Sequence, residues 1–187
     1  MRHCVFGILR TAAGLKIKDE MLKWLLPLYK VECVEQDPPG KEFEYPALKR
    51  AFETAVATNE PVLYLHTKGA ANTLEVYQSY VRLIWQKLFG NKERHDACFS
   101  AFEFEDEPFV LCPYAGKTKA TWFNGFIVSP KAASIALTRL LKPNECERHY
   151  YEHELFNDPR IHVKGILRND CDDKKIMSRL IKSKCRG

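Results

Sequence analysis

Two spacings of hydrophobic residues alternate along the first third of the chain. Short apolar runs at His3–Leu9, Val31–Val34 and Val62–Leu65 predict buried strands, because short apolar runs bounded by turn residues fit a parallel sheet. Between these runs, apolar side chains recur at helical spacing over Ile17–Tyr29 and Tyr45–Thr58. This βαβαβ order predicts a parallel sheet with right-handed crossovers and helices on both faces.

The rest of the chain alternates less regularly. A third helix is predicted over Leu74–Phe89, since its apolar residues keep the helical period and Gly90-Asn91 follow as a C-terminal signal. The later elements are expected in this order: strands at Ala97–Phe104, Phe109–Pro113 and Trp122–Val128, helices at Pro130–Leu141 and Glu147–Phe156, a strand at Ile161–Ile166 and a basic amphipathic helix at Lys174–Arg186. With no repeat or low-complexity linker, we expect one α/β domain, residues 1–187, with a mostly parallel central sheet flanked by helices and a mixed C-terminal part.

Composition narrows the class of protein but not the ligand. A hydrophobic share of 45% over 187 residues is typical of a folded domain, and a net charge of +5 suits an anionic small ligand or membrane surface as well as nucleic acid. Seven scattered cysteines without a C-x-x-C pair indicate a reducing compartment. No signal-peptide core and no bilayer-length apolar run is visible, so we expect a cytoplasmic protein, with a membrane-peripheral location left open.

The strand at Val62–Leu65 ends on the most informative segment, His66-Thr67-Lys68-Gly69. Ligands of open α/β sheets bind outside the carboxyl ends of such strands. A lysine and the backbone amides of a glycine-containing turn form an anion site without a metal, and phosphate fits such a site. The alternative is a solvated Lys68 and a hydrogen-bonded histidine at the strand end.

A second candidate site is the aromatic segment around Asn124-Gly125. Asn124 offers directional hydrogen bonds to a ligand rich in hydroxyl groups, and Trp122 offers an apolar face to a sugar ring. A plain edge strand with a glycine bulge explains the same residues equally well.

Two further motifs suggest metal binding. His149, Glu152 and His153 match H-x-x-E-H, in which two imidazoles bind zinc and the glutamate is a general base, but no glutamate follows Glu154 as a third ligand. A polar helix face explains the two histidines as well. The carboxylates of Asp170-Cys171-Asp172-Asp173 could chelate a divalent ion, yet acids followed by lysines also fit a solvated helix N-terminus.

The basic tail could contact anionic lipid. It lacks interleaved aromatic residues, so no nucleic acid is expected as a partner.

Several of these segments together resemble one family. The resemblance is to small bacterial and algal or viral glycosyltransferases with a GT-A-like, Rossmann-like fold, and it covers Tyr45 to Phe156. The segments that carry it are Glu44-Tyr45-Pro46-Ala47-Leu48, Leu63-Tyr64-Leu65-His66-Thr67-Lys68-Gly69, the helix with Arg82 and Trp85, Trp122-Phe123-Asn124-Gly125-Phe126, and Glu147-Arg148 with Glu152. The YLHTKG string is the most specific of these segments.

The resemblance implies a UDP- or GDP-sugar donor across the carboxyl ends of the first strands, with a glycan or other hydroxyl acceptor beyond it. Residues 1–69 would then form the nucleotide-binding half and residues 70–187 the acceptor-side half with the basic tail. GT-A enzymes hold Mn or Mg on an Asp-x-Asp pair after the third strand, where this chain has His66-Thr67-Lys68. A need for a divalent metal is therefore left open, and we hypothesise that Lys68 and His66 stabilise the leaving diphosphate directly.

The resemblance also implies a role for individual residues. Glu152, or else Glu154, would be the general base that deprotonates the acceptor hydroxyl. The expected donor contacts are Arg10, Glu35 and Asp37 for base and ribose, with Thr67, Lys68 and Gly69; the expected sugar and acceptor contacts are Arg82, Trp122, Asn124, Gly125 and Glu154. Two alternatives remain: a non-catalytic nucleotide- or sugar-binding module of the same fold, and, more distantly, a zinc-dependent hydrolase.

Overall fold

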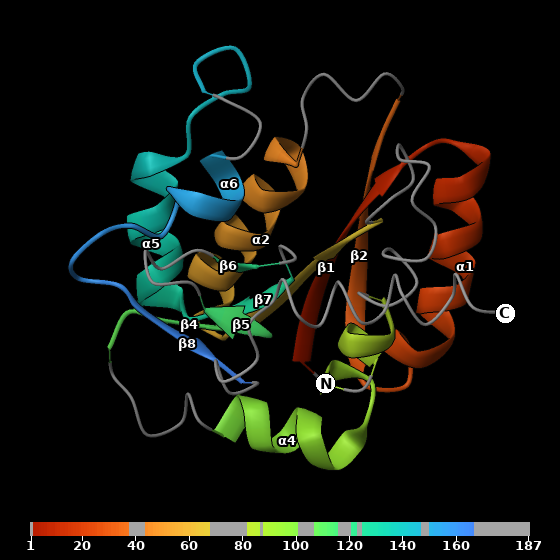
Figure 1. The fold of residues 1–187 in the computed structure, drawn as a ribbon. Helices are drawn as coiled ribbons and strands as arrows, with labels where there is room; N and C mark the ends of the chain where they lie inside the picture. Colours follow the sequence, from red (N-terminus) through yellow and green to blue (C-terminus); the bar gives the residue numbers. More distant parts are fainter. Residues whose placement is uncertain are drawn as a thin grey trace, which may run out of the picture.

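Three parallel strands form one half of a six-stranded sheet (Figure 1). β1 (Arg2–Leu9) lies between β2 (Tyr29–Gln36) and β3 (Val62–His66), with Phe6 level with Leu65. The apolar runs of β1 and β3 are buried on both faces, as is typical of parallel strands covered by helices, whereas β2 at the edge of the sheet buries only Tyr29. The computed structural model describes residues 2–37, 44–67, 82–86, 88–100, 107–115, 121–122, 125–146 and 150–166.

The first two helices cover opposite faces of these strands. α1 (Ala12–Leu25) buries Ile17, Met21 and Leu25, which are one turn apart, in a cluster with apolar side chains of β1 and β3. α2 (Tyr45–Thr58) packs its apolar side chains into a second cluster with alternate residues of the same strands. The predicted βαβαβ unit with helices on both faces is therefore confirmed.

The other half of the sheet is mixed. β7 (Phe126–Val128) runs antiparallel to both β3 and β4 (Phe109–Cys112), and β8 (His162–Gly165) is parallel to β4. The strand order is β2-β1-β3-β7-β4-β8. β5 (Tyr114–Ala115) and β6 (Thr121–Trp122) form a separate two-stranded sheet. The sheet is thus mostly parallel, as predicted, with a reversed strand at the junction of its halves.

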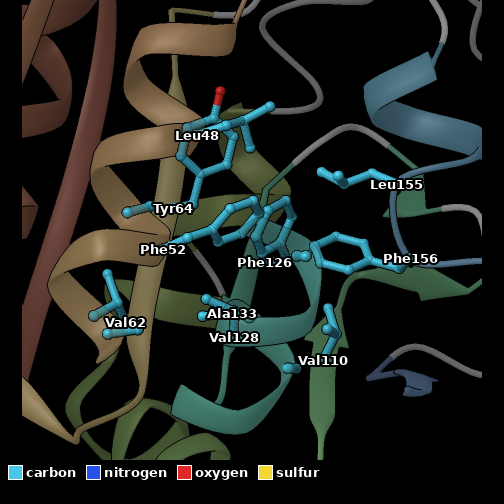
Figure 2. Close-up of a cluster of buried hydrophobic side chains, with 14 of the residues drawn as sticks. Leu48, Phe52, Val62, Tyr64, Val110, Phe126, Val128, Ala133, Leu155 and Phe156 are labelled. Atoms are coloured by element: carbon cyan, nitrogen blue, oxygen red, sulfur yellow. The ribbon is translucent and has the colours of Figure 1, made fainter. Parts of the chain in front are cut away.

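The second cluster joins both halves through aromatic side chains (Figure 2). The ring of Phe126 lies 5.1 Å from that of Tyr64 and 4.9 Å from that of Phe156, and Phe52 of α2 completes the group. α5 (Pro130–Arg139) and α6 (Tyr150–His153) flank this face, whereas α4 (Lys92–Ser100) lies near the amino end of the sheet (Figure 1).

Four predicted elements need correction. α1 starts at Ala12 instead of Ile17, because the Thr11 hydroxyl accepts a hydrogen bond from the Gly14 amide as an N-cap, and it ends at Leu25, ahead of Pro27. The helix predicted over Glu147–Phe156 is limited to Tyr150–His153 within the described residues.

The two other corrections concern strands. A strand was predicted over Ala97–Phe104, but Ala97–Ser100 is the end of helix α4. This helix begins at Lys92, because the side chain of the preceding Asn91 accepts a hydrogen bond from the Arg94 amide. The strand predicted over Trp122–Val128 is divided into β6 and β7, which belong to different sheets. The Asp170-Cys171-Asp172-Asp173 motif, the basic tail and the start of the third predicted helix lie outside the described residues. Among the residues that the structure covers, no helix combines the length and apolar character needed to cross a bilayer.

Candidate active site at the carboxyl end of the sheet

The chain order creates a switch point between β1 and β3. The crossover through α1 leads from β1 to one neighbouring strand, and the crossover through α2 returns the chain to the other side of β1. Ligands of open α/β sheets bind in the crevice that such a reversal opens at the carboxyl ends of the strands. The search for a site therefore begins with the residues that follow β1, β2 and β3.

Charged side chains from β1, β2 and α1 form a network at this end. Arg10 Nε lies 3.4 Å from a Glu35 carboxylate oxygen, and its Nη1 donates to Asp37 at 3.2 Å. Lys18 Nζ donates to the other Glu35 oxygen at 2.7 Å. The pKa of Glu35 is lowered mainly by the hydrogen bond and the positive charge of Lys18, and to a smaller extent by the positive charge of Arg10. The three predicted nucleotide contacts, Arg10, Glu35 and Asp37, thus lie together.

Thr67 joins the ends of β1 and β3. Its amide donates to the Gly7 carbonyl at 2.8 Å, and its hydroxyl accepts a hydrogen bond from the Leu9 amide at 3.0 Å. Because Thr67 is buried, its hydroxyl gives the Leu9 N–H group a hydrogen-bond partner that strand pairing does not provide. Thr67, predicted to contact the donor, therefore has a structural role in addition to any contact with a ligand.

His66 is enclosed by side chains from three elements. Its Nε2 lies 3.3 Å from Oε1 of Glu44, and the two side chains are 14% and 20% exposed. The imidazole is nearly parallel to the Tyr64 ring, with 6.1 Å between centroids, and lies 5.8 Å from the Trp85 ring. His66 is a fixed group in the candidate site.

The N-termini of α1 and α2 approach this end of the sheet closely. A Cβ on Gly14 would lie 1.9 Å from the Leu9 carbonyl oxygen, and one on Gly7 would lie 2.8 Å from the Ala47 Cβ. Only glycine permits these contacts. Because a helix N-terminus carries partial positive charge, two of them at one end of the sheet favour an anionic ligand.

Gly125 lies beside the same end of β3. It precedes Phe126, which pairs with Tyr64, and a Cβ on Gly125 would lie 2.4 Å from Trp85 Nε1. Trp85 is fully buried, and its indole N–H has no hydrogen-bond partner among the described residues. Arg82 is partly exposed and lies one helical turn before Trp85. Gly125, which was predicted to meet the sugar, thus lies against Trp85, whose ring is 5.8 Å from that of His66.

α6 brings the predicted general base near this site. Burial raises the pKa of the Tyr151 phenol, and Glu44 lies near enough to add to that effect. The Tyr151 hydroxyl donates to the Leu141 carbonyl at 2.9 Å, which fixes α6 against the chain that follows α5. Glu152 belongs to this helix, and Glu154 is exposed in the turn after it. α6 therefore stands beside the start of α2.

Some predicted residues lie outside what the structure describes. Lys68, Gly69, Asn124 and His149 are among them, and the side chains of Trp122, Glu152 and His153 are also outside the described set. The anion site at Lys68 and the zinc motif stay predictions. Among the described residues, no three His, Cys, Asp or Glu side chains form a group that could hold a metal ion.

Two residues of the site had no predicted role. Lys18 lies on α1 and Glu44 just before α2, so each meets its partner only after a crossover returns the chain to the sheet. For Glu44 a signal was present: an acidic residue immediately before a helix with Pro46 in its first turn stands at a helix N-terminus. Such a position lies at the carboxyl end of a parallel sheet.

Comparison of the chain with protein-family models, with curated proteins and with solved structures gives no match. The assignment of function therefore depends on the fold and on the geometry of this site.

Proposed function

We propose that the protein transfers a sugar from a nucleotide-sugar donor to a hydroxyl acceptor, and that its sheet belongs to the GT-A-like type. One observation carries the proposal. Charged residues at the ends of β1 and β2, the packed imidazole at the end of β3, Gly125 before β7 and the short helix α6 lie at the carboxyl end of a mostly parallel sheet, where its switch point is.

The nucleoside would bind at the Arg10 network. A carboxylate at the end of the second strand can accept hydrogen bonds from ribose hydroxyls, and Glu35 has that position. A guanidinium is suited to planar acceptors and to phosphate, so Arg10 would contact the base or the diphosphate. Lys18 and Arg10 keep Glu35 ionised, which preserves its capacity as an acceptor.

The transfer step needs one base and one site for the leaving group. The acceptor hydroxyl oxygen attacks the anomeric carbon, its proton passes to the Glu152 carboxylate, and the bond between sugar and diphosphate breaks with both electrons going to the diphosphate. Negative charge on the departing diphosphate is stabilised by Lys68, by His66 and by the helix N-termini. This assignment keeps the hypothesis that these cations stand in place of an Asp-x-Asp metal site.

A non-catalytic nucleotide- or sugar-binding module is the second candidate. It is favoured by the contacts of His66 and Thr67, since the first faces Glu44 and the second bonds to the Leu9 amide. Side chains that are engaged within the fold in this way could hold the site together without assisting a reaction.

The test separates the two candidates. Purified protein is screened by thermal shift against UDP, GDP and their sugars, with and without Mn²⁺, and release of the diphosphate is then measured with a hydroxyl acceptor. A sugar transferase is stabilised by at least one nucleotide and releases diphosphate, and Glu152→Gln abolishes the release while Glu20→Gln, an exposed position on α1, does not. Binding without release supports the module, and no stabilisation by any nucleotide contradicts both the transferase and a nucleotide-binding module.

A further inference from the structure

Glu44 faces the sheet instead of its own helix. It occupies the N-cap position of α2, yet its side chain makes no capping hydrogen bond. Its carboxylate lies 3.3 Å from His66 Nε2, in a setting where both side chains are largely shielded from water. An interaction between charges in such surroundings is stronger than one at the surface.

The imidazole has little freedom to turn away from this carboxylate. Tyr64 lies along one side of the ring at an interplanar angle of 15°, and the Trp85 ring lies 5.8 Å away at 57°. Aromatic faces also attract a cation. The surroundings of His66 therefore suit a protonated ring in one fixed orientation.

We propose that Glu44 is a positioning residue that keeps the Nε2 proton of His66 and stabilises the ring as an imidazolium, which is then a fixed cation for a nucleoside diphosphate. This inference rests on the proposed function. Because Nε2 faces the Glu44 carboxylate at 3.3 Å, a phosphate oxygen would meet the ring through Nδ1, and Nδ1 donates a hydrogen bond only when it too carries a proton. The carboxylate supplies the charge that favours this doubly protonated form.

The start of α2 is held in place independently of Glu44. Ala47 packs against Gly7 so closely that a Cβ on the glycine would lie 2.8 Å away, and Leu48 is fully buried. A change of the Glu44 carboxylate to an amide can therefore remove charge while the helix stays anchored. This permits a substitution that tests the charge and not the fold.

The experiment compares Glu44→Gln with Glu53→Gln. Glu53 is on the same helix and pairs with Lys49 on the surface, so it is a matched control. We expect Glu44→Gln to weaken binding of UDP or GDP about tenfold and the control to leave it unchanged. In a His66→Gln background, Glu44→Gln should have no further effect on affinity, because Glu44 acts through the ring.

A ¹⁵N spectrum of the imidazole gives a readout that does not depend on affinity. In the wild type with bound diphosphate, both ring nitrogens should carry protons, and in Glu44→Gln one of them should be lost. Unchanged affinity and an unchanged ring spectrum in Glu44→Gln would overturn the inference while the proposed function stands. If the wild type binds no nucleoside diphosphate, the proposed function fails, and with it the assignment of a ligand to the ring. Should Glu44→Gln not fold, a wild-type spectrum without a proton on Nε2 overturns the inference by itself.

Discussion

Gly125 shows how one missing side chain shapes the candidate site. The Trp85 indole occupies the space where a Cβ would lie, at 2.4 Å from Nε1 and 2.7 Å from Cε2. The sequence suggested that this glycine contacts a sugar. Its immediate structural role is to let a buried aromatic ring reach the end of β3, next to His66.

We therefore expect Gly125→Ala to destabilise the protein by about 1–3 kcal/mol, because the new methyl group collides with a ring that has no room to move. The measurement is chemical denaturation of the variant and the wild type. In a Trp85→Phe background, which removes the colliding nitrogen, the same substitution should cost less. An equal cost in both backgrounds would mean that the strain arises elsewhere.

Asp158 supplies a residue-scale prediction about pH. The Arg160 side chain donates two hydrogen bonds of 2.9 Å to this buried carboxylate, its amide donates another, and Arg139 lies 3.7 Å away. These contacts, led by the Arg160 side-chain hydrogen bond, hold the pKa of Asp158 well below its usual range. A carboxyl group whose pKa is lowered on folding stabilises the protein above the pKa of the unfolded chain.

That stabilisation is lost as the pH falls from about 5 toward 2. Asp158→Asn should accordingly be less stable than the wild type at neutral pH, and the difference should shrink in acid. Denaturation midpoints across this range measure it, with the exposed Asp19→Asn as the control. A difference that stays constant with pH would exclude the ion pair as its cause.

The residues that sequence reasoning could place were those at the carboxyl ends of strands. Arg10, Glu35, Asp37 and His66 were predicted at strand ends, and the structure has them there. Glu44 could be placed near a helix start, but nothing in the sequence tells which strand end its carboxylate will face. Such pairings depend on how closely a helix packs, which here is set by Gly7.

At the scale of elements, the joint between β1 and β3 depends on a hydroxyl group. The Leu9 amide is the last donor of β1 and is satisfied by the Thr67 side chain, not by another strand. Thr67→Val keeps the shape and removes the acceptor. We expect a loss of about 1–3 kcal/mol, because a buried N–H group is left without a partner.

Thr67→Ser is the matched variant for this joint, since it keeps the hydroxyl and removes only a methyl group. It should retain most of the stability that the valine variant loses. Hydrogen exchange of the Leu9 amide gives the local readout: rapid exchange in the valine variant and protection in the serine variant. The account of the joint would be wrong if the two variants lose the same stability.

Elements with a clear period of hydrophobic residues could be predicted from the sequence, and elements that depend on contacts with distant parts of the chain could not. α2 and α5 begin within one residue of the predicted positions, because Pro46 and Pro130 mark their first turns. Ala97-Cys98-Phe99 has the composition of a strand, but Cys98 and Phe99 face the core from one side of a helix. Five apolar or aromatic residues around Gly125 read as one strand, although Trp122 belongs to β6 and Phe126–Val128 form β7 of the other sheet.

At the scale of the molecule, the parallel half of the sheet follows from local pattern and the mixed half does not. Parallel strands joined by helices have few arrangements, so the order β2-β1-β3 could be anticipated. β7 pairs with β3 and β4, which are far from it in sequence, and its reversed direction carries no local signal. It is this reversal that brings Gly125 to the carboxyl end of the sheet.

The account's central claim is that this end of the sheet binds a nucleoside diphosphate. Backbone amide spectra recorded during titration with UDP and GDP test it most directly. We predict that shifts concentrate at Arg10, Glu35, Asp37, His66 and Thr67, while Ser129 and α4 at the opposite end stay unchanged. No shift with either nucleotide, or shifts confined to the amino end of the sheet, would contradict the claim.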